Sequence, residues 1–261
     1  MNTLKEFFSV LDEYAPIRLS HLMIEKGDYD NSGIIVEVND TVERVLFSLD
    51  LSQESVLYAV KNGCDTIVTH HPAIYQPIKS LSYKDTTCPL LMAIANRKNV
   101  ISMHLNLDVA ERGVDYYLMQ STLASGKFRT LDYVDGECGY GRDCDTDFSL
   151  ETLVNNLKNS LGTDKIIVYG QGMAGTIATF CGGGSSHALN YILSGKSNAD
   201  TVITSDMPHH VIKELIEKGK NIVLIPHYAS EEYGFNKFYE FVKEKLKNQI
   251  TAYYFDDKRF K

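Results

Sequence analysis

Apolar residues along the chain recur either with the period of a helix or in short continuous runs that are typical of buried strands. Leu4, Phe7 and Leu11 share one helical face, so the pattern predicts a helix over residues 4–14. Further helices are predicted at residues 53–61, 90–97, 114–123, 150–161, 187–193, 208–218 and 231–247, and strands at residues 34–36, 45–50, 66–68, 100–104, 166–169, 176–180, 201–204, 221–227 and 251–255. This alternation of strands and helices is typical of an α/β fold with mostly parallel sheets.

The composition changes between Lys127 and Asp147, where Gly, Asp, Cys and Arg replace the periodic apolar pattern. We interpret this stretch as the crossing into a second lobe, because the alternation of strands and helices then starts again. The predicted division assigns residues 1–127, joined by the returning residues 227–261, to a first α/β lobe. Residues 128–226 form the predicted second α/β lobe.

Composition and charge narrow the class of protein. Hydrophobic residues make up 44% of the 261 residues and charged residues 23%, as is usual for a soluble globular protein. The formal net charge of −8 argues against a nucleic-acid partner, because affinity for the phosphate backbone rests on Lys and Arg.

The N-terminal segment contains Lys5, Glu6, Asp12 and Glu13, which excludes the apolar core of a signal peptide, and no apolar run is long enough to span a bilayer. The five cysteines are scattered and none forms a C-x-x-C pair, so reduced thiols are expected. We therefore expect a cytoplasmic protein without a membrane partner.

Two adjacent histidines, His70 and His71, follow the predicted strand at residues 66–68 and precede Pro72. Neighbouring side chains on a strand point to opposite faces, so the two imidazoles share a site only where the backbone turns. Pro72 favours such a turn because it restricts the conformation of His71. Neutral imidazole is the commonest metal-binding side chain, and the pair is therefore a candidate for half of a metal site.

Other candidate ligands follow later strands. His104 ends one strand and precedes Asp108, and His227 ends another and precedes Glu231 by one helical turn. Ligands in open α/β sheets gather beyond the carboxyl ends of strands, which favours a shared site. Two alternatives stay open: His104 as a hydrogen-bonded core residue, and Glu231 as a charge that stabilises the start of its helix.

Three histidines and two carboxylates make up the candidate metal site: His70, His71, Asp108, His227 and Glu231. Nitrogen and oxygen donors without sulfur suit two divalent ions of zinc, iron, manganese or nickel. Five ligands leave open positions for water, as in a catalytic site. Two divalent ions would outweigh the two carboxylates and attract an anionic substrate, while Glu231 could bridge the ions and His104 or His210 could supply a proton.

Two further polar stretches have open interpretations. The run from Cys181 to Gly184 lies between a strand and a helix, where it could form a tight turn or an anion cradle. It matches neither the P-loop nor the dinucleotide-binding pattern. His209 and His210 follow Pro208 at the start of a helix and could do no more than cap and solvate it.

Ordered motifs along nearly the whole chain resemble the Nif-three-like (YbgI-like) family, whose members are often labelled GTP cyclohydrolase I type two homologues. The motifs are Tyr29-Asp30-Asn31-Ser32-Gly33, Ser48-Leu49-Asp50, Thr69-His70-His71-Pro72, His104-Leu105-Asn106-Leu107-Asp108, Ile203-Thr204-Ser205-Asp206 and His227-Tyr228-Ala229-Ser230-Glu231. The chain departs from the family at Tyr29, where tryptophan is usual, and at Ser205, where glycine is usual.

The resemblance implies two similar α/β lobes, a dinuclear metal site and a ring-shaped homohexamer with the sites facing its interior. In the family pattern Glu231 bridges the ions, His71 and Asp108 serve one ion, and His70 and His227 serve the other. No large insert separates the lobes, as in the short form of the family.

Three functions remain open on the sequence. The first is a metal-dependent hydrolase that acts on a nucleotide or similar anion, with GTP as the named candidate. The second is a metal-binding or metal-handling protein without catalysis. The third is a scaffold that contacts a transcription regulator or DNA, and the net charge of −8 weighs against direct DNA binding.

Overall fold

The computed structural model covers residues 3–261, which divide into two compact α/β units. The first unit comprises the residues up to Leu107 together with Asn236–Asp257, and the second comprises Asp108–Phe235 together with Lys258–Lys261. Helices α5 (Leu105–Asp108) and α10 (His227–Lys245) contribute residues to both units. The domain boundaries expected from the sequence, at 127/128 and 226/227, stay a prediction. No helix among the described residues combines the length and the apolar character needed to cross a membrane.

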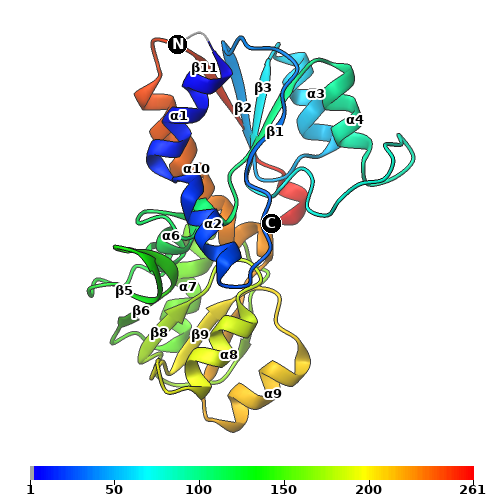
Figure 1. Cartoon of the computed structure of the whole chain (residues 1–261). Helices are drawn as coiled ribbons and strands as arrows, with labels where there is room; N and C mark the ends of the chain where they lie inside the picture. Colours follow the sequence, from blue (N-terminus) through cyan, green and yellow to red (C-terminus); the bar gives the residue numbers. More distant parts are fainter. Residues whose placement is uncertain (1–2) are drawn as a thin grey trace. The chain divides into compact units, whose positions relative to one another are not determined.

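The first unit is built on a five-stranded sheet in the order β1-β4-β3-β2-β11. Strands β2, β3, β4 and β11 are parallel, and β1 pairs with β4 in the antiparallel direction. The strands are β1 (Gly33–Val36), β2 (Arg44–Ser48), β3 (Thr66–Thr69), β4 (Asn99–Ser102) and β11 (Thr251–Phe255). Helices α3 (Gln53–Lys61) and α4 (Cys88–Ala95) lie on one side of this sheet, and α1 (Leu4–Tyr14) lies on the other (Figure 1).

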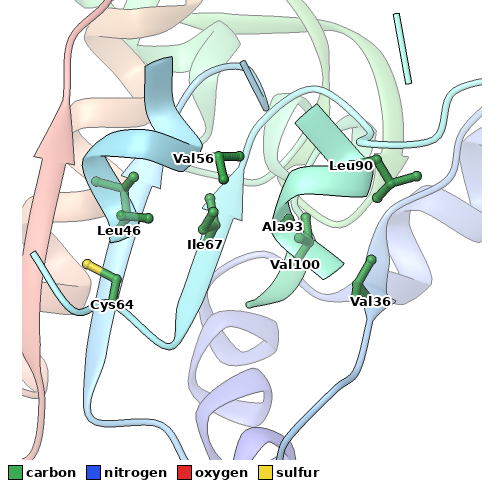
Figure 2. Packing of buried hydrophobic residues seen from close by; sticks show 9 residues of the cluster. Val36, Leu46, Val56, Cys64, Ile67, Leu90, Ala93 and Val100 are labelled. Atoms are coloured by element: carbon green, nitrogen blue, oxygen red, sulfur yellow. The ribbon is translucent and has the colours of Figure 1, made fainter. Parts of the chain in front are cut away.

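Neighbouring residues of β2 supply the cores on the two faces of this sheet. Leu46 packs in a buried cluster with apolar side chains of β3, β4, α3 and α4 that Figure 2 labels, Ile67, Val100, Val56, Leu90 and Ala93, and the cluster also includes Ala59. Phe47 points to the opposite face, where its ring centroid lies 6.0 Å from that of Phe238 in α10. Each such buried side chain stabilises the fold by about 1.5–3 kcal/mol.

Local signals fix the helix ends in this unit. Thr3 and Glu6 form a capping box at the start of α1, and Ser52 accepts a hydrogen bond from the Ser55 N–H at the start of α3. Helix α3 ends at Asn62 followed by Gly63, whose φ of +65° suits glycine. The sequence did not predict α2 (Ile17–Glu25), because Pro16 was interpreted only as the end of the preceding helix.

The second unit is built on a six-stranded mixed sheet in the order β5-β6-β8-β9-β10-β7. Its middle strands β8, β9 and β10 are parallel, whereas β6 and β7 pair with them in the antiparallel direction. The strands are β5 (Arg129–Asp135), β6 (Cys138–Asp145), β7 (Ile167–Tyr169), β8 (Thr176–Thr179), β9 (Thr201–Thr204) and β10 (Asn221–Leu224). The helices are α6 (Val114–Ser121), α7 (Leu150–Leu161), α8 (Ser185–Leu193) and α9 (His209–Glu217), and a short 3₁₀ helix spans Lys258–Phe260.

Two sequence expectations are corrected in this unit. No strand was predicted between Lys127 and Asp147, but this stretch contains the antiparallel hairpin β5–β6. The hairpin is rich in polar residues and glycine, so it lacks the apolar alternation that predicts a strand. Glycine is required at Gly139 and Gly141, because a Cβ atom at either position would overlap neighbouring atoms. Strand β10 ends at Leu224 rather than at His227, and α10 begins at His227 rather than at Glu231.

Candidate metal centre

The carboxyl ends of β2, β3 and β4 are in register, so the residues that follow them gather at one edge of the first sheet. Ser48 pairs with Thr69, and Thr69 pairs with Ser102. The polar residues that follow these three strand ends are Asp50, His70, His71 and His104. Three parallel strands therefore place three imidazoles and a carboxylate at the edge where α/β sheets bind ligands.

The imidazole rings of His70, His71 and His104 form one cluster. Their centroids lie 5.1 Å apart for His70 and His71, 5.4 Å for His70 and His104, and 5.9 Å for His71 and His104. The backbone N–H groups of His70 and His71 both donate to the Leu49 carbonyl at 3.0 Å. This shared acceptor marks the turn that the sequence required for two adjacent histidines to reach one site.

The Nδ1 atoms of both predicted ligands in this cluster are hydrogen-bonded to acceptors. His70 Nδ1 lies 2.8 Å from the Met103 carbonyl oxygen, and His71 Nδ1 lies 2.7 Å from Asp50 Oδ1. Because a carbonyl oxygen only accepts, the neutral His70 ring has its proton on Nδ1 and its lone pair on Nε2. Metal-binding histidines are commonly oriented in this way, with the ring N–H donated to a carbonyl or carboxylate.

His104 is anchored by a buried carboxylate. Its Nδ1 lies 2.8 Å from Asp30 Oδ1, and its backbone N–H donates to Ser32 Oγ at 3.0 Å. Burial of Asp30 opposes its ionisation, but hydrogen bonds from His104, Ser20 and Ser32 outweigh burial and hold its pKa below the usual range. His104 is therefore a hydrogen-bonded residue whose ring also lies in the histidine cluster.

The second unit repeats this arrangement at the ends of β8, β9 and β10. Thr179 pairs with Ile203, and Thr204 pairs with Leu224, so these three strands also end in register. The residues that follow them are Cys181 and Gly182 after β8, Ser205 and Asp206 after β9, and His227 after β10. Glu231 lies one turn further along α10.

His227 lies between two carboxylates. Its Nδ1 is 2.5 Å from Asp206 Oδ2, and its Nε2 is 3.1 Å from Glu231 Oε1, so the predicted pairing of His227 with Glu231 on one helical face is confirmed. Burial alone would lower the pKa of His227, but Glu231 and Asp206 outweigh it and raise the pKa to about 10. A positive charge is thus stabilised at this point of the second unit.

Gly182 provides the space beside these two side chains. Its φ is +57°, and a Cβ atom at this position would overlap Glu231 Oε1 and come within 3.3 Å of His227 Nε2. The Gly182 N–H donates to Ser230 Oγ at 3.1 Å, which fixes the loop against α10. The run from Cys181 to Gly184 is therefore a tight turn packed against the candidate ligands, and the amides of Cys181 and Gly182 donate to side chains of the protein.

Asp108 is placed next to a buried thiol. Cys181 Sγ lies 3.5 Å from Asp108 Oδ1, and the Cys181 N–H donates to Asp115 Oδ1 at 3.1 Å. Burial raises the pKa of Cys181 well above its usual value, and Asp108 and Asp115 raise it further. Cys181 is therefore a neutral thiol that donates to the carboxylate.

Asp115 is held in turn by a buried guanidinium, since Arg142 Nη1 lies 3.3 Å from Asp115 Oδ2. The same Nη1 donates to the carbonyl of Gly139 at 2.7 Å. Burial raises the pKa of Asp115 to about 7 although Arg142 opposes the shift. The Arg142–Asp115 pair therefore connects β6 and α6 to the turn that contains Cys181.

His209 and His210 are exposed in the first turn of α9. Their exposure agrees with the interpretation that they solvate the helix start.

The candidate centre contains donors suitable for a divalent ion in both units: His70, His71 and His104 in the first unit, and Asp108, His227 and Glu231 in the second. Imidazole nitrogens and carboxylate oxygens fit zinc, iron, manganese or nickel, and the missing side chain of Gly182 leaves room for Glu231 Oε1 to lie beside His227 Nε2.

Comparison with known proteins agrees with the motif pattern. The family model Duf34/NIF3 (NGG1p interacting factor 3) matches residues 2–258. The chain belongs to the DUF34/NIF3 family. The resemblance predicted from the sequence motifs is thereby confirmed.

Family relatives cover nearly the whole chain. A GTP cyclohydrolase 1 type 2 homolog from Clostridium perfringens is 28% identical over 256 residues, which cover 95% of this chain and 94% of the relative. Among solved structures, a Bacillus cereus protein related to NIF3 is similar with a TM-score of 0.86 and 17% identity, covering 97% of this chain and 96% of that protein. Reduced HcgD from Methanocaldococcus jannaschii has a TM-score of 0.80 and 25% identity over 98% of both chains. The predicted Nif-three-like α/β fold is therefore confirmed.

The sequence motifs contained three carboxylates whose roles were not predicted: Asp30, Asp50 and Asp206. The carboxylate of each aspartate accepts a hydrogen bond from Nδ1 of a histidine in the candidate centre. A usable signal was present for Asp50 and Asp206, because each follows a strand that lies next to the strand of its histidine. Cys181 could not be recognised as a neighbour of Asp108 without the fold.

Proposed function

We propose that this chain binds divalent metal ions and uses them to hydrolyse a nucleotide or a similar anionic substrate. The proposed ligands are His70, His71, Asp108, His227 and Glu231. The observation that supports them best is the hydrogen bond at Nδ1 of every histidine in this set, to Met103, Asp50 or Asp206. These bonds orient the three rings so that Nε2 of each could bind an ion, and His227 would first release the proton that Glu231 and Asp206 stabilise.

The family pattern suggests that two ions would be held by this set, with Glu231 and Asp108 as the carboxylate ligands and His70, His71 and His227 as the imidazole ligands. Two bound divalent ions would supply Lewis acidity and neutralise negative charge during hydrolysis. His104 lies within the histidine cluster and its Nδ1 is held by Asp30, so we assign it proton transfer to or from the substrate.

The charge of this ligand set favours an anionic substrate. Neutral histidines contribute no charge, so Asp108 and Glu231 would leave two divalent ions with an excess of positive charge. The name of the Clostridium perfringens relative makes GTP the first candidate to test. The chain's net charge of −8 argues against a nucleic-acid polymer as the partner.

The family resemblance also leads us to propose a homohexamer, which native mass spectrometry tests directly.

Hydrolysis is tested by incubating metal-loaded protein with GTP and measuring the products, with the Glu231→Ala variant assayed in parallel. We expect turnover by the parent protein and at least a hundredfold loss in the variant. Metal binding without turnover of any nucleotide would favour the alternative, a metal-handling protein without catalysis. Retention of a transcription regulator by a metal-free, inactive protein would favour a scaffold.

A further inference from the structure

Two half-exposed tyrosines form an aromatic pair beside the histidine cluster of the first unit. The rings of Tyr29 and Tyr75 meet edge to face with centroids 5.0 Å apart, and the two residues are 45% and 48% exposed. Tyr75 also meets the imidazole of His104 edge to face, with centroids 6.3 Å apart. These contacts form a continuous row of three rings that leads from the histidine cluster to the surface.

The residues that follow Tyr29 hold this row in place. The Asn31 side-chain amide donates to the Ile74 carbonyl at 2.7 Å, which ties the segment to the residue before Tyr75. Asp30 accepts from His104 Nδ1, and Ser32 Oγ accepts the His104 N–H. Asp30, Asn31 and Ser32 thus fix the position of both tyrosines relative to His104.

Edge-to-face packing leaves aromatic faces open to solvent, and an open face stacks well on another planar ring. The ring centroids of His104 and Tyr75 lie 6.3 Å apart, and those of Tyr75 and Tyr29 lie 5.0 Å apart. These distances are short enough for one nucleotide-sized ligand to contact the histidine cluster and the tyrosine pair together. We propose that Tyr29 and Tyr75 bind the planar heteroaromatic ring of the substrate while its anionic part lies at the histidine cluster. This inference rests on the proposed function and adds the class of substrate and the residues that select it.

Binding of two small probes to the metal-loaded full chain tests this assignment. Guanosine monophosphate and ribose 5-phosphate share the sugar and phosphate and differ at the base, so the ratio of their affinities isolates the contribution of the ring. Base stacking on an aromatic residue accounts for roughly 5- to 150-fold in affinity. We expect isothermal titration calorimetry to give a ratio in this range for the parent protein.

Three variants connect the ratio to the aromatic pair. Tyr75→Ala is expected to reduce the affinity for guanosine monophosphate about tenfold and leave that for ribose 5-phosphate unchanged, whereas Tyr75→Phe keeps the ring and the parent ratio. Tyr83→Ala is the matched control, because Tyr83 lies in the same loop with 71% exposure and should not change the ratio. Metal content, measured in parallel, should be the same in all four proteins.

The outcomes separate this inference from the proposed function. Equal affinities for the two probes in the parent protein, or an unchanged ratio in Tyr75→Ala, would overturn the role of the tyrosines while the metal centre stands. Absence of binding of either probe with metal present would contradict the proposed function itself. A change in native mass in Tyr75→Ala with unchanged probe affinities would show that a second copy of the chain covers the pair, which also overturns the inference.

Discussion

His71 Nδ1 lies 2.7 Å from Asp50 Oδ1, and the two residues follow the in-register ends of the parallel strands β3 and β2. The carboxylate fixes the rotation of the imidazole and increases the electron density at Nε2. His227 and Asp206 form the same contact in the second unit, after the parallel strands β10 and β9. The supporting carboxylate therefore comes from the adjacent parallel strand in both units.

Asp50→Ala is expected to weaken metal binding without unfolding the protein. Removal of a carboxylate that orients a metal-binding histidine lowers the affinity for the metal by about 10- to 100-fold. Titration of zinc against a chromogenic chelator measures the change. Asp50→Asn, which keeps an acceptor oxygen but not the charge, should lie between the parent protein and Asp50→Ala. Glu37→Ala removes an exposed carboxylate of the same unit and should have no effect. Equal affinities in all four proteins would show that Asp50 does not support a ligand.

Gly182→Ala is expected to abolish binding of one metal ion because the added methyl group would displace Glu231 and crowd His227. The backbone strain of alanine at positive φ is a separate effect and needs its own control. Gly195→Ala supplies it, since Gly195 has a φ of +69° and a Cβ atom added there would meet no other atom within 4 Å. We expect both variants to lose about 1 kcal/mol of stability from strain, but only Gly182→Ala to lose metal. Full metal content in Gly182→Ala would contradict the placement of an ion beside Glu231.

The regular elements of the chain were predictable because their signals are local. The helices at residues 4–14, 53–61 and 150–161 and the strands at residues 201–204 and 251–255 have the bounds that the apolar pattern predicts. The three helices combine a clear apolar period with capping residues such as Ser52 and Ser149. The positions of the candidate ligands at strand ends followed from the same pattern.

The missed features depend on contacts between distant residues. Hairpin β5–β6 has polar and glycine residues at buried positions. Arg142 can be buried, with 2% exposure, because it donates hydrogen bonds to Asp115 and to two backbone carbonyl groups. No periodic apolar pattern identifies a strand stabilised in this way. The link from Arg142 through Asp115 to Cys181 likewise joins residues that are far apart in sequence.

Arg142→Met is expected to destabilise the second unit by about 3–5 kcal/mol, because Asp115 would remain buried without its cation. The pKa of Asp115, already raised to about 7, would rise further in the variant. A raised carboxyl pKa lowers stability as the pH increases above about 4, so the variant should be more stable at pH 5 than at pH 8. Urea denaturation at both pH values measures this difference. The double variant Arg142→Met with Asp115→Asn should regain stability at pH 8, and its failure to do so would show that the charge of Asp115 is not the cause.

Cys64 is expected to resist alkylation in the folded protein. Burial raises its pKa to about 11, and its exposed fraction is 0%, so at pH 8 both the thiolate population and access are low. Cys138 is partly exposed and should react faster with iodoacetamide. Mass spectrometry of peptides after timed labelling measures both rates. The rates should become similar in denaturant, and equal rates in the folded protein would contradict the burial of Cys64.

The metal content of the purified chain tests the central claim most directly. We expect inductively coupled plasma mass spectrometry to find close to two divalent ions per chain after reloading with zinc, iron, manganese or nickel. The Glu231→Ala variant should fall sharply below that value while keeping the circular dichroism spectrum of the parent. Little or no metal in the reloaded parent protein would mean that these histidines and carboxylates serve the fold alone, and the hydrolase proposal would then be wrong.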